Sequence, residues 1–172
     1  ESMSESQRDI VILIIDDSRL MRQLQRGILS TLGPVELVEA DSGLAAIQEL
    51  QARNFQVDLI LVDWVMPVMD GITFVQHIKS SPNLRAIPIL MVTSCSDEPR
   101  MREAWKCGVD GYLLKPFTRE LFLQAIVGLE GDDKNEFLEV QEPMEQEEEA
   151  PAFLDNVPAE LKERLMNLSI PV

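Results

Sequence analysis

The chain is poor in the residues that build disulfide frameworks and metal clusters, with only two cysteines and one histidine among 172 residues. Cys95 and Cys107 have no metal-binding spacing and suit a reducing cytosol. No apolar run reaches the roughly 18 residues of a membrane span, and the polar residues 1–9 show no secretory signal. We therefore expect a cytoplasmic, globular protein, with His77 on its surface rather than at a metal.

Positive charge is also scarce. The chain has 15 Lys and Arg against 30 Asp and Glu, a net charge of −15. Residues 1–130 hold 18 acidic and 12 basic residues (net −6), and residues 131–172 hold 12 and 3 (net −9). Such a chain repels phosphate backbones. We expect no direct nucleic-acid binding, and the last 42 residues are too few and too acidic for an ordinary DNA-binding module.

Short apolar runs alternate with amphipathic stretches along residues 9–129, which predicts five strand–helix units. The expected strands are 10–15, 35–40, 59–62, 87–92 and 111–114, and the expected helices are 19–31, 43–52, 72–80, 97–107 and 119–127. Leu20, Leu24 and Ile28 of the helix 19–31, and Leu32 directly after it, recur at helical spacing. Alternating units predict an α/β fold with a doubly wound, open parallel sheet of flavodoxin-like order 2-1-3-4-5. Five units are too few for an eight-stranded barrel.

Polar side chains follow four of the expected strands. Asp16 and Asp17 follow the first, Asp63 the third, Thr93 the fourth and Lys115 the fifth. Each alone has an ordinary structural explanation, such as a helix cap or a surface lysine, but the predicted sheet brings all five to one edge. Three crowded carboxylates need a cation, and Mg²⁺ prefers their oxygens. With a lysine and a hydroxyl beside them, the set can carry a phosphoryl group on Asp63.

These residues closely resemble the motifs of the receiver domain of two-component response regulators, the chemotaxis type included. The matching stretches are Asp16-Asp17, Asp63-Trp64-Val65-Met66-Pro67-Val68-Met69-Asp70-Gly71, Thr93-Ser94 and Gly111-Tyr112-Leu113-Leu114-Lys115-Pro116-Phe117. The resemblance covers residues 9–129. It implies that Asp63 accepts a phosphoryl group from a histidine kinase or a histidine phosphotransfer protein.

The resemblance also implies roles for the neighbours of Asp63. Asp17 and Asp63 would bind Mg²⁺ directly, Asp16 through water, and Val65 through its backbone carbonyl. Thr93 and Lys115 would contact the phosphoryl oxygens, and the Lys115–Pro116 bond would be cis.

A conformational switch is implied as well. Tyr112 would rotate inward when Thr93 shifts, and the surface of the fourth helix, fifth strand and fifth helix would then change for a protein target. Val65 and Cys95 depart from receivers with polar side chains at these positions. Because neither can orient an attacking water well, we expect slow loss of the phosphoryl group from Asp63.

The remainder of the chain forms two further segments. Residues 130–150 are an acidic linker that we expect to stay extended. In residues 151–172, Pro158 suits a first helical turn, and Leu161, Leu165 and Leu168 fall on one face. A helix this short is marginal alone, so we expect it to dock on its own receiver, on a second copy or on a partner. A frayed tail is the alternative.

The sequence therefore predicts a phosphorylation-switched signalling protein that acts by protein–protein contact and is no enzyme beyond its own phosphoryl uptake and hydrolysis. A phosphate sink or phosphotransfer intermediate without its own output is the alternative. A flavodoxin-like cofactor binder would need a Gly- or Ser/Thr-rich phosphate loop after the first strand, where two aspartates stand instead. A metal-dependent phosphatase would need a substrate pocket that no further residues suggest.

Overall fold

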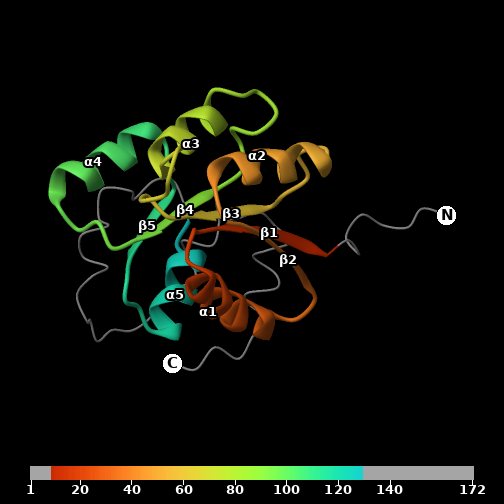
Figure 1. Ribbon diagram of the computed structural model, residues 1–172. Helices are drawn as coiled ribbons and strands as arrows, with labels where there is room; N and C mark the ends of the chain where they lie inside the picture. Colours follow the sequence, from red (N-terminus) through yellow and green to blue (C-terminus); the bar gives the residue numbers. More distant parts are fainter. Residues whose placement is uncertain (1–8, 130–172) are drawn as a thin grey trace.

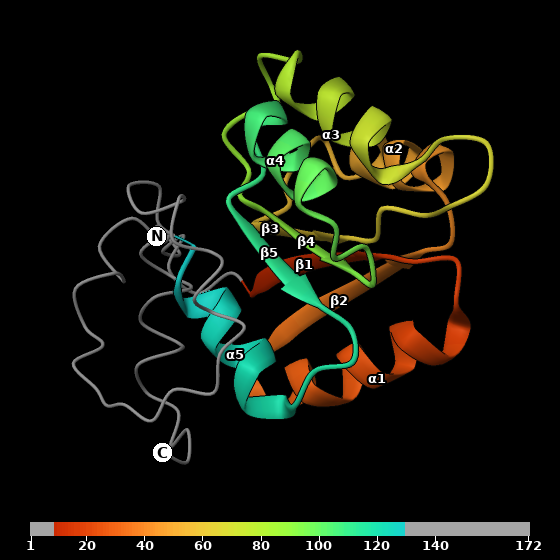
Figure 2. The same cartoon turned by 90° about the vertical axis from the view of Figure 1, so that its left-hand side faces the viewer.

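The computed structural model of the protein describes residues 9–129, which form a five-stranded parallel sheet flanked by helices on both faces (Figures 1 and 2). The strands are β1 (Ile10–Ile15), β2 (Val35–Ala40), β3 (Leu59–Val62), β4 (Ile89–Thr93) and β5 (Gly111–Leu114), in the order β2-β1-β3-β4-β5. This confirms the predicted fold. The predicted linker 130–150 and terminal segment 151–172 lie outside the described residues.

The helices divide between the two faces of the sheet. They are α1 (Arg19–Leu29), α2 (Gly43–Ala52), α3 (Gly71–Lys79), α4 (Glu98–Cys107) and α5 (Arg119–Val127), and a 3-10 turn, Ser30–Leu32, follows α1. Helices α1 and α5 cover one face, and α2, α3 and α4 cover the other (Figure 1). Within residues 9–129, no helix combines the length and apolar character needed to cross a membrane.

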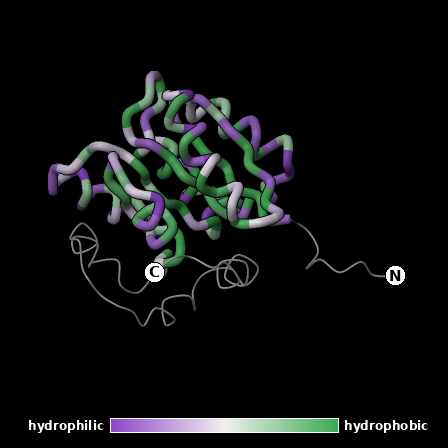
Figure 3. The backbone as a smooth tube through the Cα atoms, turned by 90° about the horizontal axis from the view of Figure 1, so that it is seen from below, coloured by the Kyte–Doolittle hydropathy of each residue, from purple (hydrophilic) through white to green (hydrophobic). Residues whose placement is uncertain are grey.

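The central strands are apolar on both sides because helices cover both faces. In β1, Leu13 and Ile15 belong to the core under α2, α3 and α4, whereas Ile12 and Ile14 belong to the core under α1 and α5. In Figure 3 the hydrophobic stretches gather in the middle of the domain and the hydrophilic ones lie mainly at its periphery. The sheet is therefore a rigid base for the residues at its carboxyl edge.

A polar side chain at the start of each helix fixes the boundary between strand and helix. Ser18, Ser42, Asp70, Asp97 and Thr118 each accept a hydrogen bond from the backbone N–H three residues later. Strand β4 begins two residues later than predicted, after Pro88, which has no N–H to donate to a neighbouring strand. Thr93 is the last residue of that strand.

The leucine pattern of α1 does not mark its buried face. Leu20 and Leu24 are 75% and 47% exposed, whereas Gln25 and Leu29 are 1% and 0% exposed. The sequence spacing correctly indicates a helix, but the core lies against a different side of it. Two leucines are consequently left on the surface, one turn apart.

The loop after β3 folds back on the end of the strand. The N–H of Gly71 donates to the carbonyl of Trp64 at 2.7 Å. A Cβ atom at Gly71 would collide with the backbone carbonyl of Asp63 and would lie 2.8 Å from the Cα of Trp64. Glycine is required here because two backbone segments approach each other closely.

We predict that Gly71→Ala lowers the free energy of unfolding by about 2 kcal/mol or more, because backbone atoms rather than a flexible side chain must move. Gly27→Ala is the matched control. Gly27 lies within α1, where an added Cβ atom would have no neighbour within 4 Å, so alanine there should stabilise the helix by about 0.5–1 kcal/mol. Urea unfolding of both variants measures the difference. Equal effects would contradict the close-approach argument.

Candidate functional site

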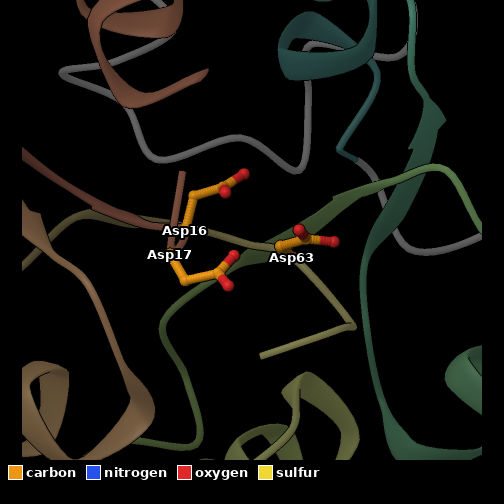
Figure 4. Close-up of side chains that lie close together, drawn as sticks. All are labelled: Asp16, Asp17 and Asp63. Atoms are coloured by element: carbon orange, nitrogen blue, oxygen red, sulfur yellow. The ribbon is translucent and has the colours of Figure 1, made fainter. Parts of the chain in front are cut away.

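Three carboxylates lie together at the carboxyl edge of the sheet (Figure 4). Asp16 and Asp17 directly follow β1, and Asp63 directly follows β3, which pairs with β1. One oxygen from each residue lies within 4.8 Å of the other two. Asp16 and Asp63 are 1% and 7% exposed, whereas Asp17 is exposed. The predicted convergence of the three aspartates is confirmed.

Lys115 supplies the positive charge of this cluster. Its ammonium donates to Asp16 Oδ2 at 2.9 Å and to Asp63 Oδ2 at 3.0 Å. Burial raises the pKa of Asp16, although the hydrogen bond from Lys115 opposes this shift. Burial alone would lower the pKa of Lys115, but hydrogen bonds and charge from the two aspartates outweigh it and raise that pKa. The lysine stays charged in this setting and holds Asp16 and Asp63 together.

A second cation, Arg22, supports the cluster from α1, and no sequence motif signals it. Arg22 donates from Nη1 to the backbone carbonyl of Asp16 at 2.7 Å and from Nε to Glu39 of β2 at 2.9 Å. The Oδ1 of Asp16 also accepts from the N–H of Ser18 at 2.9 Å. These contacts fix the turn between β1 and α1, so Arg22 is a positioning residue. The contact between Arg22 and Glu39, which are 17 residues apart in the sequence, is visible only in the folded structure.

Thr93 and Tyr112 are linked to each other through the backbone of Cys95. The N–H of Cys95 donates to Thr93 Oγ1 at 3.3 Å, and the hydroxyl of Tyr112 donates to the carbonyl of Cys95 at 2.7 Å. Thr93 is 0% exposed and Tyr112 is 3% exposed. The resemblance implies a tyrosine that rotates inward, and in this structure Tyr112 already lies inward.

Arg100 of α4 lies at the edge of the same site. Its Cζ is 5.9 Å from the ring centroid of Trp64, a cation–π contact, and its Nη1 donates to Cys95 Sγ at 3.0 Å. The hydrogen bond to Cys95 is the main cause that raises the pKa of Arg100. This residue connects α4 to the loops after β3 and β4, and no sequence pattern identifies it.

Three further predictions concern Val65, the Lys115–Pro116 bond and His77. Val65 is two residues after Asp63, and its side chain is 58% exposed. The Lys115–Pro116 bond is cis, as the resemblance implies. His77 is exposed on α3, as predicted. The role of the Val65 carbonyl as a metal ligand stays a prediction.

The donor set fits a divalent cation. Asp16, Asp17 and Asp63 offer carboxyl oxygens to one small volume, and Lys115 is the ammonium that bridges two of these residues. Hard oxygen ligands of this type suit Mg²⁺ or Mn²⁺. Because Asp17 is exposed, the cluster is open to solvent on the side of that residue, where a cation can enter.

The sequence model of the response regulator receiver domain matches residues 12–127. The chain belongs to this family. It is also 37% identical over 115 residues to the chemotaxis protein CheY of Pseudomonas aeruginosa, an alignment that covers 67% of this chain and 91% of the relative. The predicted membership of the receiver family, of the chemotaxis-like type, is thereby confirmed.

Solved structures show the same likeness. CheY4, a chemotaxis protein of Vibrio cholerae, superposes with a TM-score of 0.62 at 32% identity, covering 68% of this chain and 95% of that one. The Mn²⁺-bound form of the response regulator Rcp1 superposes with a TM-score of 0.59 at 31% identity, covering 67% and 88%. The Mn²⁺ bound by that response regulator agrees with the kind of cation that the acidic cluster of this chain suits.

Tyr112 is the single tyrosine of the chain, so its ionisation can be followed directly. Burial is the main cause that raises its pKa well above the usual value. We predict that the folded protein shows little tyrosinate absorbance at about pH 10, where the unfolded chain is half ionised. Since only the neutral phenol fits the fold, its contribution to stability is present below about pH 10 and is lost as the pH rises further. A folded protein that titrates like the unfolded chain would contradict the buried position.

Proposed function

We propose that the chain is a response regulator that accepts a phosphoryl group on Asp63 from a phosphohistidine of a histidine kinase or histidine phosphotransfer protein. The observation that carries this proposal is the position of Asp63, which shares Lys115 with Asp16 and lies beside Asp17. One Asp63 oxygen attacks phosphorus, the P–N bond breaks, and the imidazole keeps the electron pair of that bond.

The surrounding residues would compensate the charge of the incoming group. Lys115 already donates to Asp63 and would donate to a phosphoryl oxygen in turn, while the hydroxyl of Thr93 offers a further hydrogen bond. We propose Mg²⁺ as the physiological cation. Asp17, Asp63 and the Val65 carbonyl would hold it directly, and Asp16 would hold it through water. When bound, it would neutralise negative charge on the phosphoryl oxygens.

The output would be a change in surface shape. If Thr93 moves toward a phosphoryl oxygen, its link to Cys95 changes, and Cys95 is the residue that holds the Tyr112 hydroxyl. Tyr112 belongs to β5, between α4 and α5, so the surface of α4, β5 and α5 would present the change to a protein target in the cytoplasm.

A phosphate sink or phosphotransfer intermediate is the second candidate. The observation that favours it is the inward position of Tyr112, whose hydroxyl is already bound to the carbonyl of Cys95. If that position does not change on phosphorylation, the surface offers no new signal, and the chain would only remove phosphoryl groups from a kinase.

We predict that the wild-type chain takes up label from acetyl phosphate only with Mg²⁺ present and that Asp63→Asn abolishes uptake, because an amide oxygen is a far weaker nucleophile. Asp41→Asn is the control, since Asp41 is an exposed aspartate after β2 and should not affect uptake. Radiolabel retained on the protein gives the measurement. Uptake by the Asp63 variant, or uptake without a divalent cation, would refute the proposed site.

A further prediction concerns the lifetime of the phosphorylated state. We expect Val65→Asn to shorten it severalfold, because an amide next to Asp63 can orient a water that valine cannot. Val68→Asn is the control, because Val68 lies in the same loop with its side chain 95% exposed. Decay of labelled protein after removal of donor measures both. A wild-type lifetime of only seconds would contradict the expected slow hydrolysis.

A further inference from the structure

The outward face of α1 carries no charge along its centre. Leu20, Gln23, Leu24 and Gly27 recur at the three- and four-residue spacing of one helical face, and all four are exposed. We call them the α1 stripe. Leu20 and Leu24 are 75% and 47% exposed, and Gly27 adds no side chain, so a second helix could approach closely. Nothing among the described residues covers this stripe.

Arginines border the α1 stripe. Helix α1 contains Arg19, Arg22 and Arg26 and no acidic residue. Arg22 and Arg26 share one carboxylate, that of Glu39. Arg22 is largely buried against Glu39, whereas Arg19 and Arg26 are exposed. The exposed charges of the helix itself are therefore positive, on a chain of net charge −15. The surface is suited to a segment in which an acidic stretch is joined to an apolar helix face.

The same chain contains such a segment. Residues 131–150 hold nine acidic residues and one lysine (net −8). Residues 151–172 hold three acidic and two basic residues (net −1), and Leu161, Leu165 and Leu168 recur at helical spacing within them. We propose that residues 151–172 dock as a helix on the α1 stripe of their own receiver, with the three leucines against Leu20 and Leu24. The acidic residues of the chain before them would lie near the arginines of α1.

The length of the linker is compatible with this contact. Residues 130–150 separate the end of the described domain from the segment, and a flexible chain of 21 residues has a root-mean-square span of roughly 25 Å. Helix α1, with 11 residues, is only about 16 Å long. Helix α5, after which the linker begins, lies on the same face of the sheet as α1 (Figure 1). The linker can therefore span to the α1 stripe, and it supplies an effective concentration on the order of 1 mM.

Because of the position of the stripe, the contact would affect phosphoryl transfer to Asp63. This part of the inference rests on the proposed function. Leu20 is three residues after Asp17, at the end of α1 nearest the acidic cluster. A protein that delivers a phosphoryl group to Asp63 must approach this edge, whereas a small donor such as acetyl phosphate needs little space. The docked segment would therefore slow transfer from a protein donor and leave transfer from acetyl phosphate unchanged.

Hydrogen exchange of the full-length chain tests the docking itself. A helix of this length exchanges freely when alone, whereas a docked one with an affinity of about 0.1 mM should exchange about tenfold more slowly at an effective concentration of about 1 mM. The double variant Leu20→Ser, Leu24→Ser should remove the protection of residues 158–168. Leu44→Ser is the matched control, since Leu44 is 52% exposed on α2, on the opposite face of the sheet.

The segment can be altered independently of the receiver. Leu161→Ser, Leu165→Ser, Leu168→Ser should also remove the protection, whereas Lys162→Ser, Glu163→Ser, Asn167→Ser, which changes the other side of the expected helix at constant net charge, should not. Absence of protection in the wild-type chain, or equal loss with Leu44→Ser, would overturn the proposal. If the protection grew with protein concentration and the protein sedimented as a dimer, the stripe would bind a second copy of the chain. That result would overturn the proposal as well.

Phosphotransfer separates this inference from the proposed function. The three-leucine variant should accept a phosphoryl group severalfold faster than the wild type from a phosphorylated histidine phosphotransfer domain and at an unchanged rate from acetyl phosphate. Equal rates from the protein donor would refute the blocking role. If Asp63 takes up label from neither donor, the proposed function fails, whereas the exchange result still decides whether the segment docks.

Discussion

The crowding of three carboxyl groups around one ammonium group determines the arrangement of residues at the carboxyl edge of this sheet. Asp16 and Asp63 are almost fully buried, Asp17 lies beside them, and Lys115 is the ammonium that touches two of the three. Buried carboxylates are costly unless cations and hydrogen bonds compensate them. The turn held by Arg22 and the loop closed at Gly71 keep the aspartates close in spite of their repulsion. Affinity for a divalent cation follows from the same arrangement.

Most of the fold and the central site were predictable because they depend on strongly local rules. Apolar runs such as Ile10–Ile15 are typical of buried strands. Alternation with helices then determines a parallel sheet, and a parallel sheet brings the residues after its strands to one edge. Asp16, Asp63 and Lys115 therefore meet although up to 99 residues separate them along the chain.

The features that the sequence did not reveal depend on how elements pack rather than on which elements form. The spacing of Leu20 and Leu24 indicates a helix, but it does not say which side of the helix the sheet covers, and Gln25 lies on the buried side instead. The contacts of Arg22 and Arg100 join distant segments without a motif. The inward position of Tyr112 depends on a hydrogen bond to a carbonyl 17 residues earlier in the chain, and no local pattern predicts it.

The hydrogen bond between Tyr112 and the Cys95 carbonyl would affect how strongly the proposed switch responds to phosphorylation. Under the proposed function, Tyr112 would exchange between an inward and an outward position, and phosphorylation could only redistribute the two populations. The higher the resting share of the inward form, the smaller the gain that remains for any stimulus and the greater the background output. One phenol and one backbone carbonyl would therefore limit the dynamic range of the proposed switch.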